Sequence, residues 1–104
     1  MFGLCKGAFA EYACALEAKL VRKPESLSFD QAAAVPVAGL TALQGLRDKG
    51  HLQPGQKVLI NGAAGGIGTF AVQIAKSFGA NVTGVWSVGH SLANLVQLSI
   101  RQYE

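Results

Sequence analysis

The sequence predicts an α/β fold that contains one β-α-β unit. Three features indicate it: an apolar segment at 57–60, a glycine-rich segment at 61–69, and an amphipathic, helix-like segment that leads to a second apolar segment at 81–86. Two parallel strands need a crossover connection of a dozen or more residues, which is usually a helix. The spacing of these segments supplies such a connection, so we expect two adjacent parallel strands joined by a helix.

Length and composition favour one small globular domain. The 104 residues are 50% hydrophobic and 14% charged, which is typical of a folded chain rather than a disordered one. The net charge of +3 comes from scattered lysines and arginines, so we expect no nucleic-acid partner. The longest uncharged apolar stretch, 32–40, is too short to span a bilayer, and Lys6 and Glu11 interrupt the N-terminal segment. We therefore expect no signal peptide and no membrane partner.

The cysteines and other ligand-type residues predict no metal site. Cys5 and Cys14 are too few for a disulfide scaffold or a structural zinc site, and no His or carboxylate cluster lies between them. We expect two free thiols in a reducing cytoplasm. No acid–base pair or nucleophile–base spacing is visible, so the sequence nominates no catalytic residue.

The first part of the chain predicts short strands. Residues 8–14 alternate Phe9 and Glu11 with smaller side chains, which is typical of a strand. Residues 19–23 have the composition of a second short strand, which Pro24 ends.

Two helices are expected next. Ser28 and Gln31 have the spacing of a capping box, so a helix is expected to begin there. Pro36 lacks a backbone donor and clashes with the preceding turn, so it predicts a break or kink. A second helix over about 39–48 is expected to end at Gly50.

The β-α-β unit follows a turn at Pro54-Gly55. Residues Lys57–Asn61 are short and mostly apolar, as in a strand buried on both faces of a parallel sheet. The amphipathic segment Ile67–Phe78 predicts the helix, with Gly79 as its cap. Asn81–Trp86 predicts the second strand.

The segment NGAAGGIGTF (61–70) fits a phosphate-binding loop. A sharp turn out of the strand, close approach of the backbone to a pyrophosphate, and tight packing of the helix each favour glycine. The N-terminus of the helix supplies free N–H groups and a positive dipole. When residues 63–68 are aligned with G-x-G-x-x-G, Gly65 and Gly68 match and Ala63 takes the first glycine position. A glycine-rich turn without a ligand is the alternative. A P-loop is disfavoured because no Gly-Lys-Ser/Thr closes the segment.

Three motifs in order carry a family resemblance. They are GAFAEY (7–12), SFDQAAAVPVAGLTA (28–42) and VLINGAAGGIGTFAVQIAK (58–76). Over about residues 2–87 the chain resembles the medium-chain dehydrogenase/reductase superfamily, in its quinone oxidoreductase-like, zinc-independent branch, which is often labelled zinc-type alcohol dehydrogenase-like. Alanine at the first glycine position is usual in that branch. The resemblance implies a partial Rossmann-like unit preceded by the last strands of a GroES-like domain.

The resemblance also implies a function. It implies NADPH-dependent reduction of quinones or of activated C=C and C=O bonds, by hydride transfer in a cleft between a GroES-like catalytic domain and a dinucleotide-binding domain. Thr41 would then lie near the nicotinamide and Ser87 near the adenosine ribose, although a Thr41 hydroxyl bonded to its own helical turn is the alternative. The loop positions that would hold the pyrophosphate are Ala64, Gly65, Gly66 and Ile67, followed by Gly68 of the motif.

The segment after Val85 departs from the family pattern. The family continues with a Ser-Thr-Arg/Lys-like segment whose cation meets a 2′-phosphate, whereas this chain has WSVGHS (86–91). The Asp or Glu that NAD-binding units carry about 20 residues after the loop is also missing. His90 is interpreted as a surface residue, with partial replacement of the cation as the alternative. The resemblance implies NADP, and NAD stays open.

We expect three regions. Residues 1–27 would be a remnant of the GroES-like domain, 28–87 the first part of the dinucleotide-binding domain, and 88–104 a divergent tail with a helix over 92–104 capped by Ser91. A complete dinucleotide domain has about six strands, so we expect the isolated chain to be inactive. The alternative to an oxidoreductase fragment is a non-catalytic module that binds a nucleotide or forms a homo-oligomer through an uncovered sheet edge.

Overall fold

The computed structural model describes residues 1–87 and 95–100. The backbone forms two compact units, Met1–Val37 and Ala38–Glu104, and the division falls within helix α2 (Pro36–Leu43). The predicted regions 1–27, 28–87 and 88–104 are not tested by this division and stay a prediction. No helix in the described part of the chain is long and apolar enough to cross a membrane.

The first unit contains a two-stranded ladder. Strand β1 (Phe2–Gly3) pairs antiparallel with β2 (Leu20–Val21), which follows the 3-10 turn η1 (Glu17–Lys19). The strand predicted at 19–23 is therefore present in shortened form. The strand predicted at 8–14 is wrong, because these residues have no strand to pair with: β1 and β2 pair only with each other. A strand needs a ladder partner for its N–H and C=O groups, and alternation in the sequence supplies none.

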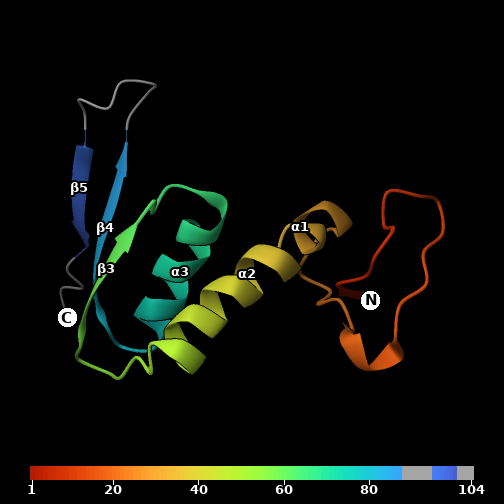
Figure 1. Ribbon diagram of the computed structural model, residues 1–104, viewed down its shortest axis with the longest axis horizontal. Coiled ribbons are helices and arrows are strands. Elements are labelled where there is room, and N and C mark those ends of the chain that lie inside the picture. The colour runs from red at the N-terminus through yellow and green to blue at the C-terminus, as the bar shows by residue number, and fades with distance from the viewer. Residues whose placement is uncertain (88–94, 101–104) are drawn as a thin grey trace. The chain divides into compact units, whose positions relative to one another are not determined.

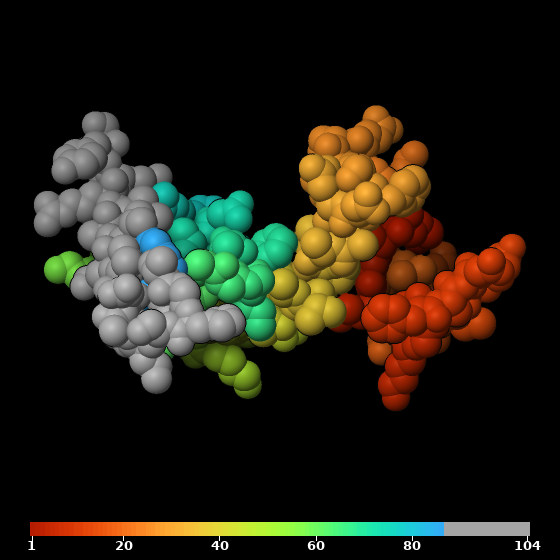
Figure 2. Space-filling model, turned by 90° about the horizontal axis from the view of Figure 1, so that it is seen from above, coloured from red at the N-terminus to blue at the C-terminus, as the bar shows by residue number. Residues whose placement is uncertain are grey.

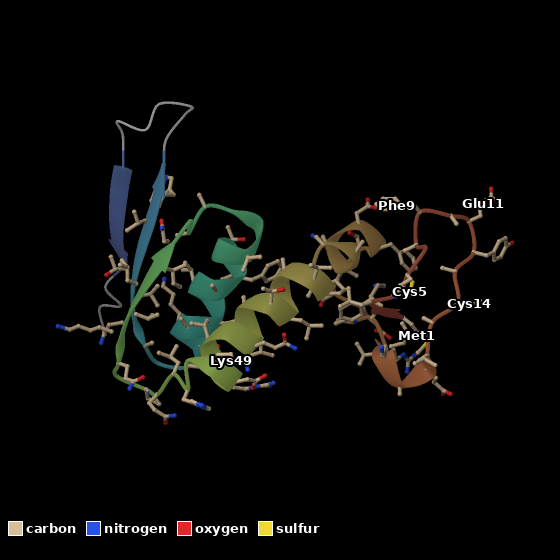
Figure 3. All side chains as sticks on the ribbon, viewed as in Figure 1. Met1, Cys5, Phe9, Glu11, Cys14 and Lys49 are labelled. Carbon is tan, nitrogen blue, oxygen red and sulfur yellow. The ribbon has the colours of Figure 1, made fainter. Side chains whose placement is uncertain are left out.

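Side chains of the loop between β1 and η1 project outward, as the red segment of Figure 2 shows. Phe9 is 109% exposed and Tyr12 is 91% exposed. Figure 3 shows Glu11 and Cys14 on the same loop, and Cys5 and Cys14 are both exposed and unpaired. Both sequence parities of this loop therefore face solvent, whereas a half-buried strand would bury one of them.

The start of helix α1 (Phe29–Ala33) confirms the predicted capping box. The Gln31 N–H donates to Ser28 Oγ at 3.1 Å, and the Ser28 N–H donates to Gln31 Oε1 at 2.9 Å. Ala32 is the buried residue of this helix. The break predicted at Pro36 is also confirmed, because α1 ends before it and α2 begins with it. Proline suits the first position of a helix, where a backbone donor has no intrahelical partner.

The second unit contains the predicted β-α-β unit. Strand β3 (Lys57–Asn61) and strand β4 (Asn81–Ser87) are parallel neighbours, and helix α3 (Gly66–Ser77) connects them (Figure 1). Gly79 follows the helix with a φ of +76°, as expected of a left-handed C-terminal cap. The predicted fold class, α/β with a partial Rossmann-like unit, is confirmed.

The helix predicted over 92–104 is wrong where the structure describes it. Residues Leu95–Ile100 form strand β5, which is antiparallel to β4 with Ser87 opposite Leu95 and Val82 opposite Ile100. The physical reason is the edge of β4 away from β3, whose backbone groups need partners that a helix cannot supply. The other residues of the predicted helix, with Ser91 and His90, lie outside the described residues.

Small side chains form the core of the second unit. Helix α3 lies against one face of the sheet (Figure 1), and the close approach is possible because most of the buried side chains are alanines. The cluster consists of Ala42, Ile60, Ala63, Ala71, Ala75, Ala80 and Val82. The prediction that β3 is buried on both faces is wrong: Ile60 is 8% exposed but its neighbour Leu59 is 67% exposed. Among the described elements, only one face of β3 is covered.

The π-helical segment η2 (Gln44–Lys49), which continues α2, ends in an unusual way. Gly50 follows it as predicted, and a Cβ there would lie 3.0 Å from the Gly45 carbonyl oxygen. The left-handed residue, however, is His51, with a φ of 46°. The Leu52 N–H then donates to the Leu46 carbonyl oxygen at 3.0 Å and closes the end of the helix. A side chain at 50 would therefore be tightly packed, and glycine would be preferred at 51 for conformation.

This helix end predicts a stabilising substitution. His51→Gly should raise the free energy of unfolding by about 0.5–1 kcal/mol, because it removes the cost of a side chain in the left-handed region. Gly50→Ala is the control at the neighbouring position and should lower the free energy of unfolding, because the backbone at Gly45 and Leu46 would have to give by a few tenths of an ångström. Urea unfolding followed by circular dichroism measures both. A loss of stability in His51→Gly would contradict this interpretation.

Candidate phosphate-binding loop

The glycine-rich segment lies at the carboxyl end of β3. Residues 62–65 connect this strand to the N-terminus of α3, and the Ala63 N–H donates to the Val85 carbonyl oxygen of β4 at 3.0 Å. The loop is therefore fastened to the carboxyl end of both parallel strands. Open α/β sheets bind ligands outside the carboxyl ends of their strands, so the position suits a binding loop.

Gly62 makes the turn out of β3. Its φ is +73°, and the Gly65 N–H donates to the Gly62 carbonyl oxygen at 2.9 Å. A Cβ on Gly62 would meet no heavy atom within 4 Å, so space does not explain the glycine. Its conformation does, since side-chain-bearing residues rarely adopt positive φ.

Gly68 lets the helix pack on the loop. A Cβ on Gly68 would lie 2.0 Å from the Gly62 carbonyl oxygen and 2.8 Å from Ala63 Cα. Gly68 is buried, whereas a Cβ on Gly66 would have no neighbour within 4 Å. The two glycines on the first turn of α3 thus differ in role: Gly68 is required by packing, and Gly66 leaves the surface of the loop open.

Four of the five predicted loop residues are exposed, and the fifth, Gly68, is buried. The first N–H groups of a helix have no intrahelical partner, and no side chain caps α3 at Gly65. The first turn of α3 contains no acidic residue that could neutralise the positive end of the dipole. Ile67, although apolar, is 48% exposed and lies outside the core. The exposed residues are Ala64, Gly65, Gly66 and Ile67.

The field at the loop comes from the backbone. Segment 61–69 contains no titratable side chain, and the hydroxyl of Thr69 is engaged locally, donating to the Gly66 carbonyl oxygen at 3.1 Å. The resolved pKa shifts lie on η2, where a hydrogen bond from Arg47 lowers the pKa of the exposed Asp48. A ligand at the loop would therefore meet amide dipoles rather than charged side chains.

The two other predicted site residues, Ser87 and Thr41, lie outside the glycine-rich loop. Ser87 ends β4 two residues after Val85, so its backbone is at the same end of the strand as the loop. Thr41 is exposed on α2 and precedes Ala42, which belongs to the same buried cluster as Ala63. Both residues belong to elements beside the loop rather than to the loop itself, and their roles stay predictions.

Gly84 of β4 was missed by the sequence reasoning. It is buried, and a Cβ there would lie 2.8 Å from Ala63 Cβ. The available signal was a glycine inside a strand, which often marks close approach of another part of the backbone.

The two glycines of the first helical turn give a matched pair of substitutions. Gly68→Ala should lower the free energy of unfolding by about 3 kcal/mol, because its Cβ collides with backbone that cannot rotate away. Gly66→Ala should change it by no more than about 0.5 kcal/mol, because the site is open and alanine suits a helix. Chemical unfolding of both variants measures the difference. Equal effects would show that α3 does not pack on the loop as described.

Comparisons with known proteins identify a quinone oxidoreductase and a polyketide synthase component among the relatives of this chain. No protein-family model matches the chain. It is 41% identical over 78 residues to a quinone oxidoreductase of Pongo abelii, and the match covers 75% of this chain and 24% of that protein. It is 43% identical over 89 residues to the pikromycin polyketide synthase component PikAII of Streptomyces venezuelae, covering 86% of this chain and 2% of that protein.

A solved structure agrees in fold. The quinone oxidoreductase from Thermus thermophilus, also solved in complex with NADPH, has a TM-score of 0.64 and 43% sequence identity over 73% of this chain and 25% of that one. The present chain thus spans a quarter or less of the length of these relatives. Two of these relatives are quinone oxidoreductases, and the glycine loop fits them. The chain therefore belongs to the medium-chain dehydrogenase/reductase superfamily, in its quinone oxidoreductase-like branch.

Proposed function

We propose that this chain binds the pyrophosphate of a nicotinamide dinucleotide through the loop before α3, as part of an NAD(P)H-dependent oxidoreductase. The observation that carries the proposal is the N-terminus of α3, which is exposed, uncapped by side chains and positioned by the packing of Gly68 on Gly62. The reaction of the complete enzyme would be hydride transfer to a quinone, an enone or a carbonyl compound.

The residues present fit the cofactor. A pyrophosphate needs several hydrogen-bond donors and a positive potential. The amides of Ala64, Gly66 and Ile67 at the helix dipole offer both, while the Gly65 N–H already donates to the Gly62 carbonyl oxygen. The open space at Gly66 leaves room for an approaching phosphate. A bound nicotinamide would supply the hydride, while the chain itself binds and orients the dinucleotide. We propose that Thr41 lies near the nicotinamide ring and Ser87 near the adenosine ribose.

The cofactor preference proposed here is NADP, with NAD as the alternative. The relative from Thermus thermophilus solved with NADPH supports a nicotinamide dinucleotide of that type. Residues 86–91 contain neither the lysine or arginine nor the aspartate or glutamate that usually distinguishes the two. We also propose a cytoplasmic location, which the exposed free thiols Cys5 and Cys14 support.

Binding is tested by titration of the chain with NADPH, followed by cofactor fluorescence. Ile67→Glu should weaken binding about tenfold, because a carboxylate on the first helical turn repels the phosphates. It should leave the fold at least as stable, because a negative charge there favours the helix dipole. Ile67→Gln is the matched neutral control and should bind like the unsubstituted chain.

The same titration can refute the proposal. Absence of saturable NADPH binding by the unsubstituted chain would count against it, and equal affinities of the Glu and Gln variants would place the phosphates elsewhere. A quinone-dependent NADPH oxidation assay separates binding from turnover. We propose that the isolated chain binds without turnover, so measurable turnover would contradict that part.

A second candidate function is a non-catalytic oligomerising module. The observation that favours it is the face of β3 opposite α3, where Leu59 is 67% exposed, next to an edge of β3 that has no neighbour in the described sheet. Unpaired edges and exposed apolar side chains favour association with another chain.

The homo-oligomer proposal predicts a concentration-dependent increase in mass, measured by size-exclusion chromatography with light scattering. Leu59→Lys should shift the chain toward the monomer, because it places a charge on the uncovered face. Leu59→Ile, which keeps an apolar side chain and the strand propensity, is the control and should associate like the unsubstituted chain. An unsubstituted chain that stays monomeric at all concentrations would refute this candidate.

A further inference from the structure

We propose that Ala63 and Gly84 form a size-complementary pair that positions the loop for a diphosphate ligand. The inference rests on the proposed function and adds a positioning role for a residue of β4. In the motif G-x-G-x-x-G the first position is a glycine, and here Ala63 occupies it. The space that this alanine needs is provided by the neighbouring strand β4, where Gly84 lies against it.

The contact between the two residues is close. Ala63 is 8% exposed and Gly84 is buried. A Cβ on Gly84 would lie 2.8 Å from Ala63 Cβ, a separation that real Cβ atoms essentially never show. Position 63 or position 84, but not both, can therefore carry a methyl group while the loop keeps its position against β4. Gly84 pairs with Ile60 in the parallel ladder, so its own position is fixed by the sheet.

The loop has little freedom to move away from a larger residue at 84. On its strand side, the Ala63 N–H donates to the Val85 carbonyl oxygen at 3.0 Å. On its helix side, Gly62 and Ala63 lie against Gly68. A methyl group at 84 would push Ala63 away from β4, and the displacement would pass to the exposed residues 64–67. Among them are Ala64, Gly66 and Ile67, whose amides we propose as phosphate donors. Hydrogen bonds weaken steeply as distance and angle depart from their optimum.

A purely structural role for Gly84 makes a different prediction. If Gly84 served only the packing of β4, Gly84→Ala would be equally harmful whatever residue stood at 63. If the pair is complementary, Ala63→Gly should rescue Gly84→Ala, because the methyl group has then only moved from one side of the contact to the other. Double-mutant cycles isolate such pairwise coupling.

The experiment compares four full-length chains: the unsubstituted chain, Gly84→Ala, Ala63→Gly and the double variant. NADPH titration gives their affinities, urea unfolding gives their stabilities, and ¹H–¹⁵N spectra report the amides of residues 64–67 without any ligand. We expect Gly84→Ala to bind NADPH about tenfold more weakly and to shift these amides, and the double variant to return within about threefold of the original affinity.

Each outcome decides the proposal. A double variant as weak as Gly84→Ala, with unrestored amide shifts, would overturn it. If Gly84→Ala does not fold, a folded double variant is itself the rescue, and an unfolded one overturns the proposal. If the unsubstituted chain binds no NADPH, the proposed function fails, and the pair is then judged on stability and amide shifts alone: coupling between the two substitutions supports it, and additive effects overturn it.

Discussion

The packing of Gly68 on the backbone of Gly62 and Ala63 is the constraint on which the second unit depends. It sets how closely α3 can approach the end of β3, because any side chain at 68 would meet a carbonyl oxygen at 2.0 Å. The same contact determines where the first turn of the helix begins and therefore which amides are left without intrahelical partners. The fold and the candidate site thus depend on the same contact of Gly68 with the loop. A substitution that weakens the packing of α3 on the loop also displaces the site.

The alanine-rich core follows from this close approach. Helix α3 turns Ala71 and Ala75 toward the sheet, and Ala75 is fully buried. Small side chains allow a short distance between helix and sheet but bury little apolar area each, and hydrophobic stabilisation scales with buried area. No large side chain in the described part of the chain is fully buried. The buried alanines therefore position the loop closely but contribute only modestly to stability. On the opposite face of β3, Leu59 is left uncovered.

The features predicted correctly from the sequence are those determined by nearby residues. The capping box of Ser28, the break at Pro36 and the cap at Gly79 each depend on a few adjacent positions. The strand predicted at 8–14 and the helix predicted over 92–104 failed where the outcome depends on a partner distant in sequence. Residues 8–14 have alternation but no ladder partner, and residues 95–100 have a partner, β4, that helical periodicity does not reveal. Backbone pairing decided both cases.

The same distinction explains what could be seen of the site. When the sequence is aligned with G-x-G-x-x-G, Ala63 stands where a glycine is expected and therefore counts as a mismatch to the motif. In the folded unit the relevant comparison is between Ala63 and the strand beside it, 21 positions later in the chain at Gly84. A backbone that must approach a ligand closely needs space, and it does not matter which of two contacting residues gives up its side chain. The glycine requirement of such a loop is thus a property of a contact, and its sequence signature can be divided between the loop and a neighbouring strand.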